Sequence, residues 1–330
     1  MKTGLKQKYA TKEERENCKD LLRNSKVDEY TKEIRRLHDR YPNDKIILFD
    51  LAAHYLREDI NPSEGMLYFA MAIDKKNMYS IYYEKGMYYL NHGEFGKARI
   101  EFEKLLSGNT IMQCRGIVNI IRCDIHLNYY SEALLLFRRL SQLSEKCNFE
   151  IPYATNLLFY LKYNNGELSS ADIAKYRQNN YYAQMVIDYD PQAVIDHVIE
   201  HNTDEFLKEH PENTSRFDDN VDIEEIYWHC TDAINGIFID GDIKPNNYSI
   251  TGDYYIVPVG TNIGISVAGL PSESVELFTL PGTKDIITMH PTSNRFSNRR
   301  FEDNLVGFKA KKLAAKEAKK KENDIEPYEY

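Results

Sequence analysis

Apolar residues in the first 145 positions recur at helical intervals, within segments that short polar stretches separate. In residues 27–41, Tyr30, Ile34 and Leu37 fall on one face of a helix, and Pro42 ends the segment. The same pattern predicts four consecutive pairs of helices and the start of a weaker fifth pair. The predicted segments are 12–25 with 27–41, 45–58 with 63–74, 79–91 with 94–107, 112–127 with 130–144, and then 153–163.

The helix pairs also repeat a pattern of large and small residues at a spacing of 33 to 35. The clearest copy is Tyr82, Gly86, Tyr89, Gly93, Phe95, Ala98, Phe102 and Leu105. Parts of it recur as Leu37, as Gly65, Phe69 and Ala72, and as Tyr130, Ala133, Phe137 and Leu140. A fixed period in this range is typical of proteins in which each helix pair buries its apolar face against the next pair.

This pattern resembles the tetratricopeptide repeat (TPR) over about residues 10–145. The chain departs from the repeat at Ile121, where a glycine or alanine is usual, at Asp124, where an aromatic is usual, and at Cys18, in a small-residue position. The resemblance implies an α-solenoid of helical hairpins. It also implies a non-catalytic scaffold or adaptor that binds a protein partner in a concave groove.

In the family that the chain resembles, the first helix of each unit lines the groove. The corresponding positions here are Arg15, Lys19, Arg23, Phe49, Arg57, Tyr83, Asn91, Arg115, Arg122 and His126. Spacings of four and seven place the cations of one helix on one face. We therefore expect a basic groove for an acidic peptide or a free C-terminal carboxylate, which arginine would hold by paired hydrogen bonds. The alternative is that these are ordinary solvated charges.

From residue 169 the repeat ends, and from residue 241 the pattern becomes typical of strands. Helices are expected in 169–210 and 223–238, and short β-branched or aromatic strands in 254–259, 263–267, 275–279 and 285–289. The expected fold is therefore α+β and multidomain, with an α-solenoid followed by a small antiparallel sheet or half-barrel. The predicted domains are 1–168 (repeats), 169–240 (further helices and a linker), 241–308 (β-rich) and 309–330 (a charged, lysine-rich tail).

A second group of candidate residues follows the last predicted strand. His290 and Arg295 belong to a run that also contains hydroxyl, amide and further arginine side chains. Such groups can move protons and stabilise a phosphate, so one alternative is an effector enzyme whose β-rich domain cuts RNA. A positively charged loop without catalysis is the favoured interpretation. A third alternative is a regulator in which the repeats respond to a peptide.

Charge, hydropathy and cysteine content narrow the classes of protein to which the chain could belong. The net charge of −9 argues against general nucleic-acid binding, although lysines gather in residues 309–321 and acids in residues 200–222. A mean hydropathy of −0.57 and the lack of a long apolar run predict a cytoplasmic protein without a membrane segment. Five scattered cysteines fit reduced thiols, and no metal or cofactor motif is apparent.

Overall fold

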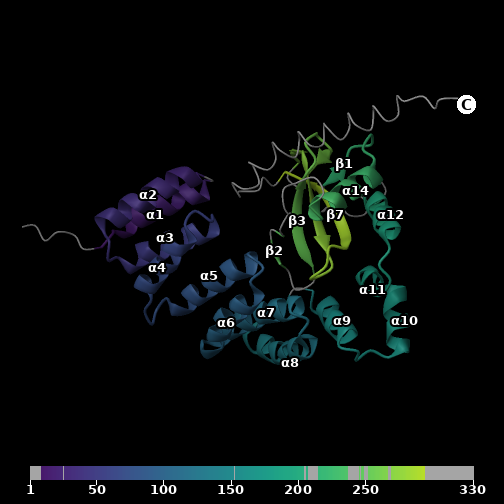
Figure 1. Cartoon of the computed structure of the whole chain (residues 1–330), viewed down its shortest axis with the longest axis horizontal. Helices are drawn as coiled ribbons and strands as arrows, with labels where there is room; N and C mark the ends of the chain where they lie inside the picture. The colour runs from purple at the N-terminus through teal and green to yellow at the C-terminus, as the bar shows by residue number, and fades with distance from the viewer. Residues whose placement is uncertain are drawn as a thin grey trace, which may run out of the picture. The chain divides into compact units, whose positions relative to one another are not determined.

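The computed structural model describes residues 9–24, 26–151, 153–203, 206, 215–236, 245, 247–248, 252–266 and 269–293. The chain divides into two compact units (Figure 1). The first unit contains Met1–Cys123 and Arg139–Phe149, and the second contains Asp124–Arg138 and Glu150–Tyr330. Within the described residues, no helix is long and apolar enough to cross a membrane.

Paired helices build the first unit (Figure 1). They are α1 Lys12–Arg23, α2 Val27–Arg40, α3 Lys45–Arg57, α4 Pro62–Ala72, α5 Met78–Asn91, α6 Phe95–Glu103 and the 3₁₀ turn η1 Lys104–Ser107. Two longer helices, α7 Thr110–His126 and α8 Tyr130–Cys147, contribute residues to both units. The helical segments predicted from periodicity are confirmed to within a few residues at each end. Helices contact one another within pairs, as in α3 with α4, and between pairs, as in α2 with α3 and α3 with α5.

Small residues allow close approach inside these pairs. A Cβ placed on Gly65 of α4 would lie 3.2 Å from the backbone oxygen of Ala52 in α3. A Cβ on Gly86 of α5 would lie 2.5 Å from the nearest ring carbon of Phe102 in α6, and that ring is fully buried. Glycine at these two positions therefore allows the facing helices to pack closely.

The second unit begins with further helices and ends in strands. Its described helices, besides its parts of α7 and α8, are α9 Ala154–Asn164, α10 Ser170–Asn179, α11 Tyr181–Ile187, α12 Pro191–His201 and α14 Ile223–Ile234. Four of these helices begin with a side-chain cap: Ser169 forms a capping box with Asp172 before α10, and Asn180, Asp190 and Asp222 cap α11, α12 and α14. These caps satisfy backbone N–H groups that the helix itself cannot.

Two small antiparallel sheets follow, so the coarse α+β prediction is confirmed. One sheet has the order β2-β3-β6-β7 and the other β1-β4-β5. The strands are β1 Arg216–Phe217, β2 Asn247–Tyr248, β3 Asp253–Pro258, β4 Gly264–Ile265, β5 Pro271–Ser272, β6 Ser274–Thr279 and β7 Ile286–Thr292. The sequence predicted the four segments that contain β3, β4, β6 and β7. It missed the two-residue strands β1, β2 and β5, and β1 lies in a range assigned to helices and linker.

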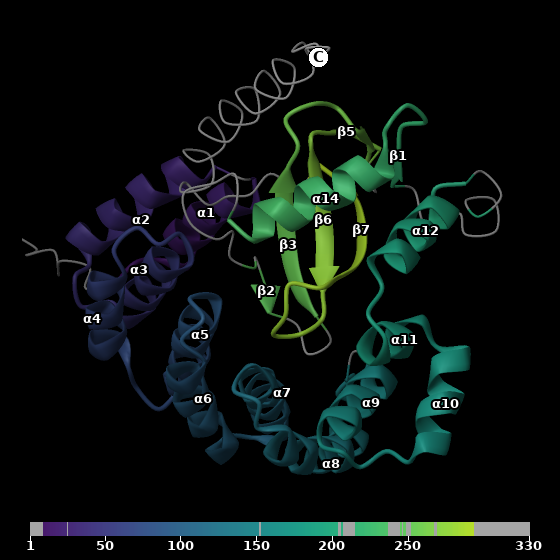
Figure 2. The ribbon, with the colours of Figure 1, turned by 45° about the vertical axis from the view of Figure 1, so that its right-hand side comes forward.

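Helices α12 and α14 cover the sheet region of the second unit. Helix α14 contacts β3 and lies across the four-stranded sheet in Figure 2, and α12 contacts both β7 and α14. Within that sheet, Ile256, Glu276 and His290 are opposite one another on β3, β6 and β7. Residues in register share a face, so this face carries a carboxylate and an imidazole on neighbouring strands.

Candidate functional site

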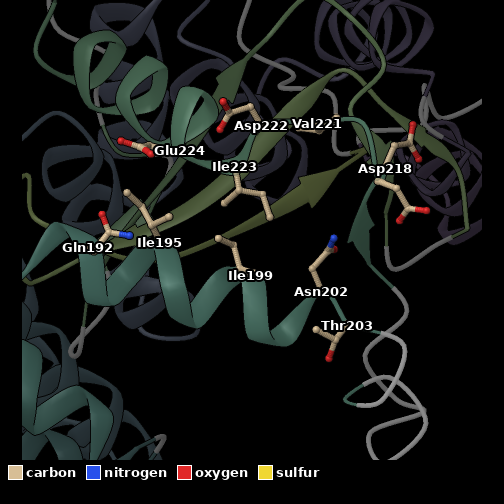
Figure 3. A pocket seen from close by; sticks show the side chains of 11 residues that line it. Gln192, Ile195, Ile199, Asn202, Thr203, Asp218, Val221, Asp222, Ile223 and Glu224 are labelled. Atoms are coloured by element: carbon tan, nitrogen blue, oxygen red, sulfur yellow. The ribbon is translucent and has the colours of Figure 1, made fainter.

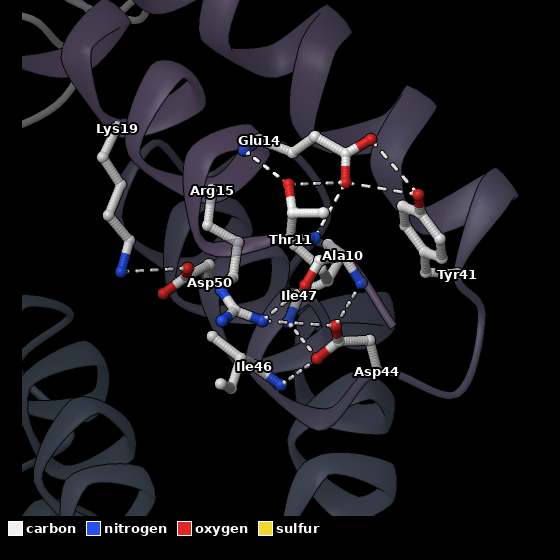
Figure 4. Close-up of polar contacts among 10 residues, drawn as sticks. All are labelled: Ala10, Thr11, Glu14, Arg15, Lys19, Tyr41, Asp44, Ile46, Ile47 and Asp50. Atoms are coloured by element: carbon white, nitrogen blue, oxygen red, sulfur yellow. Dashed lines mark hydrogen bonds and ion pairs between the residues drawn. The ribbon is translucent and has the colours of Figure 1, made fainter. Parts of the chain in front are cut away.

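Arg15 and Lys19, the first two groove candidates, are both engaged by carboxylates of a neighbouring helix (Figure 4). Arg15 Nη1 donates to the carbonyl oxygen of Ala10 at 3.0 Å and lies 3.6 Å from Asp44 Oδ2. Lys19 Nζ lies 3.3 Å from Asp50 Oδ2. Burial raises the pKa of Asp50, and Lys19 gives the largest opposing effect. These two cations therefore stabilise the packing of α1 on α3.

Asp44 explains why Arg15 is needed there. Its side chain is almost fully buried and caps α3, accepting from the backbone N–H groups of Ile46 at 3.0 Å and Ile47 at 3.4 Å. It also accepts from the N–H of Ala10 at 2.9 Å. A buried carboxylate requires donors or a counter-charge, so Arg15 has a structural role that does not depend on any ligand.

Arg23 and Arg57 are also paired. Arg23 lies 2.5 Å from Asp20 and 3.2 Å from Glu16 on its own helix. Arg57 of α3 forms two hydrogen bonds with Glu84 of α5, one of them from Nε at 3.1 Å. The two hydrogen bonds between Arg57 and Glu84 connect α3 of one helix pair to α5 of the next pair. Both guanidinium charges are therefore matched by carboxylates of the protein.

The uncharged groove candidates lie on α3 and α5. Phe49 packs 5.6 Å from Phe69 between ring centroids, and Tyr83 packs 6.2 Å from Phe102. Both side chains are half-buried, whereas Asn91 is exposed at the last position of α5. Two half-buried rings are consistent with either a packing role or an aromatic contact surface.

Arg115 and Arg122 of α7 differ from the other arginines in this set. Arg115 is exposed and forms no ion pair with any described residue. Arg122 is half-buried; its Nη1 donates to Asn119 Oδ1 at 2.9 Å, and its buried Nε has no acceptor. Burial lowers the pKa of the Arg122 guanidinium, and Tyr83 is among the groups that oppose this effect. No described carboxylate forms an ion pair with Arg122.

These residues form one stripe along α7. Arg115, Asn119 and Arg122 are separated by four and three positions, so they lie on one face of the helix. Asn119 bridges them, because its Nδ2 donates to the carbonyl oxygen of Arg115 at 2.8 Å while its Oδ1 accepts from Arg122. The two guanidinium-bearing positions are about 10 Å apart along the helix axis. We call Arg115, Asn119 and Arg122 the α7 stripe.

His126 does not belong to this open stripe. Its side chain is only 4% exposed, with Nε2 3.2 Å from Asp253 Oδ1 of β3 and the ring edge-on to Tyr248 at 4.9 Å. Burial raises the pKa of Asp253, and both His126 and the N–H of Gly282 oppose that rise. The expected role of His126 in an open groove is therefore not met. It packs in the interior of the second unit.

His290 lies on the half-buried face of the four-stranded sheet. Its Nε2 is 3.6 Å from Glu276 Oε2, and its ring stacks with Phe278 at 6.3 Å between centroids. Burial raises the pKa of Glu276, but hydrogen bonds with His290, Thr292 and Tyr254 more than compensate, so the net pKa is lowered. The other candidate of this region, Arg295, and the tail 309–330 lie outside the described residues.

Sequence reasoning did not identify the partners of these side chains. Glu276 lies 14 residues before His290, and only the register of β6 with β7 places them opposite one another. Asp253 is likewise far from His126 along the chain. No local pattern signals such pairs, because they depend on strand pairing and tertiary packing. Among the described residues, no group of three or more histidine, cysteine, aspartate or glutamate side chains could hold a metal ion.

Comparison with known proteins does not identify a relative. No family model matches the chain, and no curated protein matches it significantly.

Proposed function

We propose that the first unit is a TPR-like helical binding module that captures an acidic peptide segment of a protein partner through the α7 stripe. The observation that carries this proposal is the half-buried guanidinium of Arg122, which has neither a carboxylate partner nor an acceptor for Nε. A desolvated charge without a partner is costly, so a ligand that supplies an anion would remove that cost.

The remaining cations of the expected groove support the choice of α7. Arg15, Lys19, Arg23 and Arg57 are matched by carboxylates of the protein. An acidic ligand at those positions would have to compete with an existing ion pair. At the α7 stripe it would meet two arginines without ion pairs to described residues, whereas the amide of Asn119 between them is buried. Planar guanidinium groups bind carboxylates through two parallel hydrogen bonds, which favours aspartate, glutamate or a chain terminus as ligand.

The test measures binding of the full chain to a defined acidic peptide pool. The probe is a fluorescein-labelled set of nonapeptides rich in Asp and Glu with free C-terminal carboxylates, followed by fluorescence anisotropy. Arg122→Gln should weaken binding at least tenfold, because a hydrogen bond to a charged group contributes about 1.5–3 kcal/mol. Arg115→Gln should weaken it less, because its guanidinium is exposed and more strongly screened.

Arg36→Gln is the matched control. Arg36 is an exposed arginine of α2 that pairs with Glu33 on its own helix, away from the predicted groove face. Equal affinity for natural chain and Arg122→Gln would refute the proposal. An equal loss in Arg36→Gln would also refute it, because binding would then reflect total charge. Peptides with an amidated C-terminus distinguish recognition of acidic side chains from recognition of a chain terminus. Only recognition of a chain terminus requires the free C-terminal carboxylate.

A second candidate function has one observation in its favour. Glu276, His290 and Tyr254 gather an ionised carboxylate, an imidazole and a phenol on one half-buried sheet face. These groups could transfer protons in an RNA-cleaving effector. Incubation of the full chain with labelled single-stranded RNA tests this alternative. Cleavage that His290→Ala abolishes would support it, and an inert natural chain would exclude it for that substrate.

A further inference from the structure

An open cleft lies in the second unit between α12 and the segment that joins β1 to α14 (Figure 3). Its volume is about 490 Å³. Apolar side chains of Ile195, Ile199 and Ile223 lie at its centre, and Ile199 is 47% exposed. An aliphatic side chain with that much exposure, facing a cleft, offers an apolar contact to a ligand.

The rim of this cleft is acidic. It carries the side chains of Asp218, Asp219, Asp222 and Glu224. None of the four forms an ion pair with a described residue. Asp218 only accepts a long hydrogen bond from Asn262 at 3.4 Å, and Asp222 accepts from the N–H of Glu225 at 3.1 Å as the cap of α14. Four carboxylates within residues 218–224 suit a ligand that carries several positive charges.

We propose that this acidic cleft binds the lysine-rich segment 309–321 of the same chain. That segment contains seven lysines against one glutamate, with Leu313, Ala314 and Ala315 in its middle. The charges complement the rim, and the short apolar run complements the isoleucine centre. No other run of this length in the sequence combines so many cations with so few acids.

The connection is long enough for this docking within one chain. Fifteen residues separate Ser293, the last described residue, from Lys309. Fifteen residues can span at most about 50 Å. The chain leaves from β7, which contacts both α12 and β1, the elements that flank the cleft. Attachment to the same chain therefore raises the effective concentration of the lysines at the cleft.

The consequence is an interaction surface whose occupancy depends on the tail. Exposed charges are screened by salt, so the docking should weaken as ionic strength rises. A second cationic partner would have to displace the tail. This inference concerns only the second unit and does not depend on the peptide-binding proposal for α7.

The first experiment joins carboxylates to lysine amines in the full chain with a carbodiimide and maps the products by mass spectrometry. Peptides containing Asp218, Asp219 or Glu224 should be linked to residues 309–321. A mixture of isotopically light and heavy chains tells links within a chain from links between chains. Links found only between chains would overturn the proposal in favour of docking in a second copy, and their absence from the cleft peptides would overturn it outright.

The second experiment measures anisotropy of a labelled synthetic peptide of residues 309–321. Binding should be at least tenfold tighter to a chain whose tail lysines are replaced by glutamine than to the natural chain, because the natural tail occupies the cleft. In that tail variant, Asp218→Asn with Asp219→Asn and Glu224→Gln should abolish binding. Asp196→Asn with Glu200→Gln is the matched control, because these exposed acids of α12 do not line the cleft. Equal affinity for natural and tail-variant chains, or an equal loss in the control, would overturn the proposal.

Discussion

Gly86 of α5 provides the sharpest test of how the helix pairs pack. An alanine Cβ there would lie 2.5 Å, 2.7 Å and 2.8 Å from three ring carbons of Phe102. Carbon atoms without a bond between them prefer about 3.5–4.0 Å, so the ring would have to move by about 1 Å. Phe102 is fully buried in α6, so other protein atoms rather than solvent surround its ring. The substitution Gly86→Ala should therefore strain the α5–α6 pair.

The magnitude follows from two opposing effects. Overpacking of a tight core costs about 1–3 kcal/mol, whereas replacing glycine by alanine in a helix interior gains about 1 kcal/mol. Because the required shift is large, we expect a net loss of about 1–2 kcal/mol in the free energy of unfolding of the first unit. Gly96→Ala in α6 is the matched control, since a Cβ there has no atom within 4 Å. That variant should be neutral or slightly stabilised.

Urea unfolding can assign the effect to the correct unit. Far-UV circular dichroism reports helices of both units, whereas the chain's one tryptophan, Trp228, lies in α14 of the second unit. The circular dichroism midpoint should fall in Gly86→Ala, while the Trp228 fluorescence transition should be unchanged. In a Phe102→Leu background the cost of Gly86→Ala should shrink by at least about 1 kcal/mol, as expected for residues in contact. If Gly86→Ala proved as stable as Gly96→Ala, the close packing of α5 on α6 would be refuted.

Three further predictions follow from buried titratable groups. Burial lowers the pKa of His54 to about 4. Because the unfolded state binds the proton first, the free energy of unfolding of the first unit should fall by about 3 kcal/mol as pH decreases from 6.5 to 4. A urea midpoint that does not change between pH 7 and pH 4 would contradict this. Asp253→Ala removes the carboxylate that faces the buried His126 and should cost about 3 kcal/mol or more in the Trp228 transition. An unchanged transition would show that the pair adds nothing. Burial, together with the neighbouring Cys147 thiol, raises the pKa of Cys114 to about 11. Iodoacetamide should therefore label Cys114 far more slowly than a free thiol at pH 7.5. Rapid labelling of Cys114 in the folded chain would contradict this.

Helix positions could be predicted from the sequence because the signal is local. The spacing of Tyr30, Ile34 and Leu37 predicts a buried face of α2, and all three are buried in the structure. The two-residue strands β1, β2 and β5 could not be predicted in the same way. Strands of two residues have too few positions to show alternation, and their existence depends on a partner strand elsewhere in the chain.

The candidate site shows a different limit of the sequence. Ten positions were expected to line a groove, and their residue types did not distinguish a structural cation from one available to a ligand. Arg57 and Arg122 look equivalent in sequence, yet Arg57 is matched by Glu84, 27 positions away, while Arg122 has only the amide of Asn119. The pairing depends on which helices pack together, which periodicity does not encode.

Unmatched charge is therefore more informative about binding than net charge. The chain carries −9 overall, which would suggest a preference for cationic partners throughout. Pairing removes many of these charges from consideration, because a matched side chain gains little from a new ligand of opposite sign. In the first unit, the two arginines that were expected to line a groove and form no ion pair with a described residue lie on α7. In the second unit, the cleft beside α12 carries four carboxylates that form no ion pair with described residues. The two proposals thus assign ligands of opposite charge to the two surfaces, so substitution of Arg122 should leave binding of the lysine-rich peptide unchanged. Neutralising the cleft should likewise leave binding of acidic peptides unchanged.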